Sequence, residues 1–187
     1  VTSFKVGDHL FGATLLGGAF AEYVSVPVNV CGKIQGNASF VHMAGISIAG
    51  LTALQALVTH GKLKAGETVL INGASGGVGH FAVQIAKAYG AKITAVCSSG
   101  NIEFVNSLGA DKVIAYDKEN IHQHRGSYDL IIDANGNLNY ADYKRMGKRG
   151  VMVGFTTMAH MFSTLMSKLF GKFPLIQFTA EPNEKDL

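Results

Sequence analysis

The sequence predicts an α/β protein built around a doubly wound parallel sheet. From residue 67 onwards, short apolar runs alternate with helical stretches, which is the pattern of a parallel sheet covered by helices on both faces. A glycine-rich segment, residues 72–79 (NGASGGVG), joins the first of these runs to a helix. The composition agrees, because 48% of the 187 residues are hydrophobic and 16% are charged, as in ordinary globular domains.

The elements of the sheet region follow from hydrophobic periodicity and from glycines that end the helices. We expect strands at residues 68–72, 92–97, 112–115, 128–133 and 150–155, with a sixth at 173–179. We expect helices at residues 77–89, 101–108 and 138–146, and a short amphipathic helix at 158–170.

The first third of the chain has a different character. Residues 4–31 are predicted to be β-rich, with a half-buried strand from Phe20 to Val26, where apolar and polar residues alternate. Ser39 is expected to cap a helix. Gly45 and Gly50 should weaken the middle of that helix, which leaves Thr52–His60 as its firmer part.

The glycine-rich segment carries the most specific chemistry. Its pattern, Gly73-x-x-Gly76-x-x-Gly79, follows a strand directly and opens a helix. Gly76 allows a pyrophosphate to approach the backbone, Gly79 allows the helix to pack against the strand, and the helix start offers free N–H groups. Ala74 replaces a glycine of the usual pattern. We predict a Rossmann-type dinucleotide site formed by Gly73, Ala74, Ser75, Gly76, Gly77, Val78 and Gly79.

A P-loop is excluded, because His80 follows Gly79 where that motif needs Lys and then Ser or Thr. The end of the second strand bears on the choice of cofactor. NAD sites place a carboxylate there to bind the ribose 2′-hydroxyl, whereas this chain has Ser98, Ser99 and Asn101, which could bind a 2′-phosphate. This favours NADPH, although the same residues could simply cap the next helix.

Two further turns follow predicted strands. Asn135 and Gly136 come after the fourth strand, and Gly154 and Phe155 end the fifth. Because ligands lie at the carboxyl ends of parallel strands, we expect both turns near the nicotinamide. Ordinary turn chemistry is the alternative explanation for each.

Charge and cysteine content exclude several classes of protein. The net charge is +3, and the densest basic cluster (Lys144, Arg145, Lys148 and Arg149) is predicted to be a solvated face rather than a nucleic-acid site. Cys31 and Cys97 are isolated, which indicates a reducing, cytoplasmic setting. We expect no membrane span, since Gly or Lys interrupts the apolar stretches. We also expect no zinc, since His122-x-His124 is more typical of a polar loop than of a ligand set.

Five segments in this order resemble the medium-chain dehydrogenase/reductase superfamily, in its quinone oxidoreductase-like branch. They are residues 4–12 (FKVGDHLFG), 18–27 (GAFAEYVSVP), 50–57 (GLTALQAL), 108–111 (LGAD) and 128–133 (YDLIID). The resemblance implies a zinc-independent enzyme that transfers hydride from NADPH to a quinone or an activated enone or alkenal. It also implies that Tyr116 touches the adenosine 2′-phosphate.

The resemblance further implies a division of the chain into three parts. Residues 1–38 correspond to part of a GroES-like β-barrel, residues 39–65 to a connecting helical segment, and residues 66–187 to a Rossmann domain for NADP. Relatives extend further at both ends, so we expect the chain to be truncated there, with the catalytic residues outside it. A zinc-dependent alcohol dehydrogenase remains a less favoured alternative.

Two other interpretations stay open from the residues alone. Tyr140-x-x-x-Lys144, with Ser127 upstream, also fits the catalytic group of a short-chain dehydrogenase, in which a lysine assists a tyrosine acid. The chain could instead be a nucleotide-binding protein without catalysis. An uncovered strand at residues 173–179 could pair with a second copy and so form a homodimer.

Overall fold

The computed structural model describes residues 4–14, 17–153, 171–183 and 185–186. The chain forms two compact units, one of residues 1–52 with 180–187 and one of residues 53–179. In the first unit, strand β1 (Leu10–Gly12) pairs antiparallel with β2 (Cys31–Lys33). A single 3-10 turn (Val28–Val30) precedes β2. A salt bridge of 2.7 Å between Lys33 Nζ and Asp8 Oδ1 closes the turn that leads into β1.

The predicted strand from Phe20 to Val26 does not form. A strand exists only where a neighbour completes its backbone hydrogen bonds, and within the described residues β1 and β2 pair with each other alone in this unit. Phe20 and Val24, which alternation would place on the same buried face, are both exposed. Apolar and polar residues alternate in this segment of the sequence, but no described segment supplies a partner strand for it.

A helical run extends without interruption from Phe40 to His60. It consists of α1 (Phe40–Gly45), a π-helical turn (Ile46–Gly50), α2 (Leu51–Leu54) and a second π-helical turn (Gln55–His60). The Ser39 hydroxyl accepts the His42 amide at 3.2 Å, which confirms the predicted cap. Gly45 and Gly50 do not interrupt the run, so the expected weakness is absorbed by π-type hydrogen bonding.

The same run corrects our prediction about apolar stretches, because its 21 residues are long and apolar enough to cross a membrane. Length and composition alone do not identify a span, since buried core helices share both properties. Ala53, Ala56 and Leu57 in its second half are fully buried in the hydrophobic core of the second unit.

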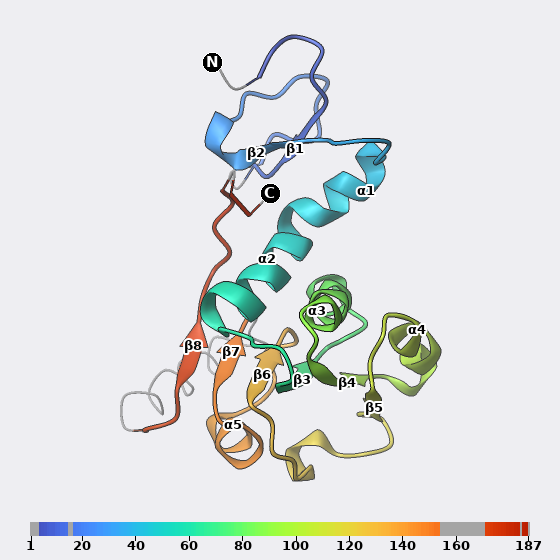
Figure 1. The fold of residues 1–187 in the computed structure, drawn as a ribbon, viewed down its shortest axis with the longest axis vertical. Helices are drawn as coiled ribbons and strands as arrows, with labels where there is room; N and C mark the ends of the chain where they lie inside the picture. Colours follow the sequence, from blue (N-terminus) through green and yellow to red (C-terminus); the bar gives the residue numbers. More distant parts are fainter. Residues whose placement is uncertain (1–3, 15–16, 154–170, 184, 187) are drawn as a thin grey trace. The chain divides into compact units, whose positions relative to one another are not determined.

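The second unit is a six-stranded parallel sheet in the order β5-β4-β3-β6-β7-β8 (Figure 1). Numbered from its first strand, this order is 3-2-1-4-5-6, which defines the Rossmann fold. The strands are β3 (Thr68–Asn72), β4 (Lys92–Cys97), β5 (Lys112–Ala115), β6 (Leu130–Asp133), β7 (Gly150–Met152) and β8 (Leu175–Gln177). All six predicted strands are therefore confirmed, with three of them shorter than expected.

Helices cover both faces of this sheet. They are α3 (Gly77–Ala88), α4 (Ile102–Ser107) and α5 (Tyr140–Met146), with single 3-10 turns at Ser99–Asn101 and Ile121–Gln123. Alternate residues of β3 point to opposite faces, so Val69 and Ile71 join a core with α3 and α4, while Leu70 joins a second core with α5. The predicted helix at residues 158–170 lies outside the described residues.

Arg149 stabilises the end of the sheet where the strands begin. Its guanidinium donates to both Glu67 carboxylate oxygens, at 2.6 and 3.1 Å, and to the backbone oxygens of Gly61 and Asp129, at 2.7 and 2.9 Å. Arg145 is likewise paired, with Asp142 at 2.7 Å. The prediction of a solvated basic face is therefore wrong for these two arginines.

Asp129 connects three elements at the same end. Its carboxylate accepts the Thr68 amide and hydroxyl, both at 2.9 Å, and the Lys148 ammonium at 2.7 Å. The lysine and the threonine donors hold the pKa of Asp129 well below its ordinary value. The start of β3 is thereby tied to the segments that lead into β6 and β7.

Candidate functional site

The glycine loop after β3 has the shape that a dinucleotide needs. Gly73 adopts a left-handed φ of +83°, and a Cβ on Gly79 would lie 2.0 Å from the Gly73 oxygen. Gly79 must therefore be glycine for helix α3 to start this close to the loop. A Cβ on Gly76 would lie 3.3 Å from the Gly73 oxygen, a tight approach, while Gly76 itself is exposed at the start of the helix.

Gly76 is also the N-cap of α3 and offers no side-chain acceptor to the first turn. That turn consists of Gly77, Val78 and Gly79, whose amides have no partner inside the helix. The 12-residue helix adds a partial positive charge at this point. An exposed glycine, free donors and positive potential together fit a pyrophosphate.

The other two predicted loop residues differ in position. Ala74 is fully buried, and its amide donates to the Val96 oxygen at 2.9 Å, so its backbone fixes the loop to β4 rather than facing a ligand. Ser75 lines the cleft beside the loop, and its hydroxyl accepts the Asn101 side-chain amide at 3.4 Å.

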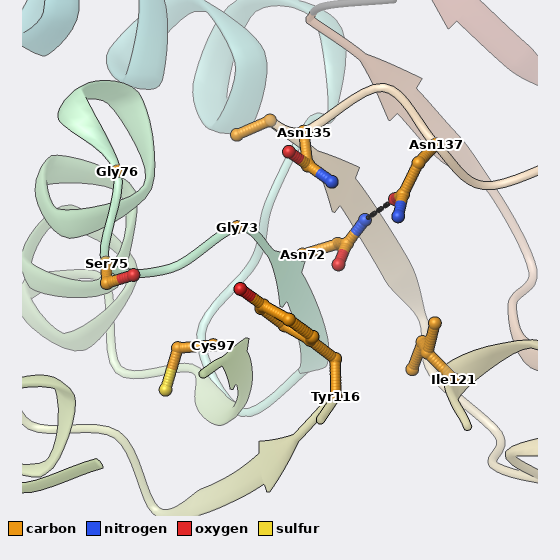
Figure 2. A pocket seen from close by; sticks show the side chains of 10 residues that line it. Asn72, Gly73, Ser75, Gly76, Cys97, Tyr116, Ile121, Asn135 and Asn137 are labelled. Carbon is orange, nitrogen blue, oxygen red and sulfur yellow. Dashed lines mark hydrogen bonds between the residues drawn. The ribbon is translucent and has the colours of Figure 1, made fainter. Parts of the chain in front are cut away.

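A cleft of about 250 Å³ opens at the carboxyl ends of the strands. It lies where the strand order reverses, between β3 and β6, which is where Rossmann folds bind ligands. Figure 2 shows the Tyr116 ring projecting from the end of β5 towards the glycine loop. The lining residues are Asn72, Gly73, Ser75, Gly76, Cys97, Tyr116, Ile121, Ala134, Asn135 and Asn137.

A buried carboxylate sets the shape of the wall that follows β6. Asp133 is fully buried and accepts the amides of Gly136 and Leu138, at 2.8 and 3.0 Å, and the Tyr143 hydroxyl at 3.0 Å. Asn72 donates to the same carboxylate at 2.8 Å. Burial raises the pKa of Asp133, and the four donors oppose that rise. The Asp133 side chain therefore fixes the backbone of the loop after β6.

Three asparagines face the cleft above this carboxylate. Asn72 bridges Asp133 and the Asn137 side-chain oxygen, the latter at 2.7 Å (Figure 2). Asn135 was predicted from its turn and does line the cleft. Asn72 and Asn137 were missed, although each lies at or just beyond the end of a strand, as Asn135 does. The predicted Gly136 has a φ of +68° and shapes the turn.

The structure at the end of β4 corrects the prediction that no carboxylate lies near the ribose 2′ position. Ser98, Ser99 and Asn101 lie together there, and the Asn101 side chain donates to the Ser98 hydroxyl at 2.9 Å. Residues 98–101, directly after β4, include no carboxylate, but the turn after the neighbouring strand β5 supplies one. Asp117 accepts the Ser99 amide at 2.7 Å and the Ser99 hydroxyl at 2.5 Å. Gly154 and Phe155, the other predicted site residues, lie outside the described residues.

The tyrosine and lysine of the short-chain dehydrogenase interpretation do not join this cleft. Tyr140 accepts the Phe173 amide at 2.9 Å, and with Lys144 it lines a separate cleft. Within the described part of the chain, no three His, Cys, Asp or Glu side chains gather as a metal site requires.

Comparison with known proteins places the chain in a family. Residues 77–177, more than half of the chain, match the model of the zinc-binding dehydrogenase family. The chain belongs to this family. More specifically, it is a medium-chain dehydrogenase/reductase of the quinone oxidoreductase-like branch. It is 43% identical over 123 residues to a chloroplast envelope quinone oxidoreductase homolog of Arabidopsis thaliana, an alignment that covers 62% of this chain. The short-chain dehydrogenase interpretation is thereby wrong.

Two further relatives of this medium-chain dehydrogenase/reductase are informative. A chloroplastic NADPH-dependent alkenal/one oxidoreductase of Arabidopsis thaliana is 40% identical over 121 residues, 64% of this chain. The structure of the quinone oxidoreductase from Coxiella burnetii matches 100% of the chain, with a TM-score of 0.85 and 28% identity. The chain spans 37% and 31% of the two Arabidopsis proteins and 60% of the Coxiella chain.

Proposed function

We propose that this chain forms the cofactor half of a zinc-independent, NADPH-dependent oxidoreductase that reduces a quinone or an activated enone or alkenal. The observation that carries the proposal is the start of α3, where the N-cap Gly76 lines the cleft at the strand-order reversal and no side chain caps the first turn. The relatives named for quinones and for alkenals and enones support the substrate class.

The cleft and the polar residues beside it, at the end of β4, have distinct tasks in this proposal. The first turn of α3 binds the pyrophosphate, and Ser98, Ser99, Asn101 and Tyr116 surround the adenosine ribose. Asn72, Asn135 and Asn137 face the nicotinamide side, where Asp133 fixes their loop. The bound cofactor supplies the hydride. The chain's own residues orient the cofactor and form one wall of the cleft.

Two further features belong to the same proposal. Residues 1–38 are inferred to be part of a GroES-like barrel, residues 39–65 its connection, and residues 66–187 the NADP-binding domain of a cytoplasmic enzyme. Strand β8 is the outer strand of the described sheet, with Ile176 37% exposed, and is inferred to pair with a second copy.

Fluorescence titration with NADPH tests the proposal, using the chain and two variants at Gly76. Gly76→Asp and Gly76→Asn add side chains of nearly equal size, so both meet the Gly73 oxygen in the same way, but only aspartate carries a charge. We expect Gly76→Asp to bind NADPH at least about tenfold more weakly than Gly76→Asn, since its carboxylate faces the pyrophosphate.

Circular dichroism of both variants checks that the fold is retained. If Gly76→Asp and the unchanged chain bind NADPH with equal affinity, the glycine loop is not part of the cofactor site. Absorbance at 340 nm with a quinone or an alkenal as acceptor then separates the two functional classes. Binding without NADPH oxidation would identify a nucleotide-binding protein rather than a reductase.

A further inference from the structure

Strands β4 and β5 bring two polar segments together beside the glycine loop. The strands pair in parallel, with Cys97 opposite Ala115, and the Tyr116 amide donates to the Cys97 oxygen at 3.0 Å. The segments that follow, Ser98–Ser99 and Tyr116–Asp117, therefore leave the sheet side by side. This adjacency explains why Asp117 reaches Ser99, a residue 18 positions earlier.

This place corresponds to the adenosine ribose in a Rossmann fold. The group that recognises the ribose 2′ position stands at the end of the second strand, about 20 residues after the glycine loop. Ser98 stands there, directly after β4. The Asn101 side chain connects Ser98 to Ser75 of the loop, with distances of 2.9 and 3.4 Å. The polar group is thus continuous with the pyrophosphate site.

Asp117 brings a negative charge to this group. Its two oxygens accept the Ser99 amide and hydroxyl, and these donors hold the pKa of the carboxyl below its ordinary value. The side chain is therefore ionised at neutral pH. A carboxylate has about four acceptor positions, so Asp117 can still accept a ribose hydroxyl.

The charged neighbours of that carboxylate are of both signs, and the adjacent Lys118 helps to lower the pKa of Asp117. Residues 97–101 carry no charged side chain, and residues 116–120 carry Asp117, Lys118 and Glu119. Glu119 contacts the His124 ring at 3.1 Å. A 2′-phosphate is ordinarily met by a cation such as arginine, whereas the residues at the end of β4 offer hydroxyls and an amide, and Asp117 next to them is ionised, with Lys118 following it in the chain.

We propose that Asp117 determines how this site divides its affinity between the two nicotinamide cofactors, by accepting the 2′-hydroxyl of NADH and repelling the 2′-phosphate of NADPH. The inference rests on the proposed cofactor site. In this chain, Asp117 reduces, without reversing, the preference for NADPH that the serine hydroxyls give by binding the phosphate.

Asp117→Asn is the sharpest test, because an amide can still accept from the Ser99 backbone and donate to its hydroxyl while the charge is lost. Titrations with NADPH and with NADH give the ratio of the two dissociation constants. We expect that ratio to move about tenfold towards NADPH. Glu119→Gln is the matched control. It removes a carboxylate from the same turn, but this carboxylate contacts His124, so the ratio of the two dissociation constants should stay unchanged.

Salt separates an electrostatic role from a structural one. The Debye length falls from about 10 Å at 0.1 M salt to about 3 Å at 1 M, so the difference between the chain and Asp117→Asn should shrink. An unchanged ratio in Asp117→Asn, or the same shift in Glu119→Gln, overturns the inference about Asp117 while leaving the cofactor site intact. If the unchanged chain binds neither NADPH nor NADH, both the inference and the proposed function fall.

Discussion

The two ends of the parallel sheet differ in whether they leave polar groups without a partner inside the protein. Where the strands begin, charges are paired within the protein, Arg149 with Glu67 and Lys148 with Asp129. Where the strands end, the cleft presents glycines, amides, hydroxyls and an uncapped helix start. Unpaired donors are costly unless water or a ligand meets them. The first end therefore stabilises the fold, and the second end is left available for binding.

The largest expected effect that tests this comparison is at Arg149. Arg149→Met keeps the aliphatic stem but removes donors from Glu67 and from three backbone oxygens. We expect the free energy of unfolding to fall by about 2–3 kcal/mol, because hydrogen bonds to charged groups contribute that much. Urea denaturation measures this loss.

Arg149→Lys refines the same experiment. Lysine retains the charge but lacks the planar fork that meets both oxygens of Glu67, so only part of the stability should return. The ratio of the dissociation constants for NADPH and NADH should be unchanged in both variants. A shift in that ratio would show that the two ends of the sheet are not independent.

A smaller effect is expected at Asp129, and it depends on pH. The folded-state pKa of Asp129 is lowered, first by Lys148, so its contribution is full above the ordinary value of 3.8. The contribution is lost as pH falls from there through the folded-state pKa. Asp129→Asn should cost about 1 kcal/mol at pH 7 and less at pH 3, because pH 3 lies only partway through the range in which the contribution is lost. Parallel urea curves for both proteins at both pH values check this, and an equal cost at the two pH values would contradict it.

The smallest effect on stability is expected at Tyr116, in the cleft. Its ring is 57% exposed, so Tyr116→Ala should change the free energy of unfolding by no more than about 0.5 kcal/mol. NADPH should nevertheless bind several-fold more weakly, since the ring borders the adenosine side of the cleft. If Tyr116→Ala lowers the stability but leaves the affinity for NADPH unchanged, Tyr116 acts in packing rather than in cofactor binding.

The sheet was predictable because its information is local. Each strand is a short apolar run, each following helix is ended by glycine or by a change of pattern, and alternation of the two elements specifies a parallel sheet. The glycine loop was predictable for the same reason, since Gly73, Gly76 and Gly79 all act within one turn. Phe20–Val26 shows the limit, because alternation does not reveal whether a partner strand is present.

The rest of the site depends on contacts between distant residues. The carboxylate at Ser99 comes from Asp117, in the turn after the adjacent strand β5, so inspection of the β4 end alone gave the wrong local charge. Asn72 and Asn137 meet only because β3 and β6 are neighbours in the sheet. Strand order supplies this information, and residue spacing does not.

The buried carboxylate of Asp133 has a consequence for the thermodynamics of binding. The loop after β6 is irregular in backbone, yet its amides at Gly136 and Leu138 are fixed by the same side chain. Loops of this kind usually lose conformational entropy when a ligand orders them, which weakens affinity. Here that conformational entropy is already lost when the chain folds, so the loop is in its ordered conformation before a ligand binds.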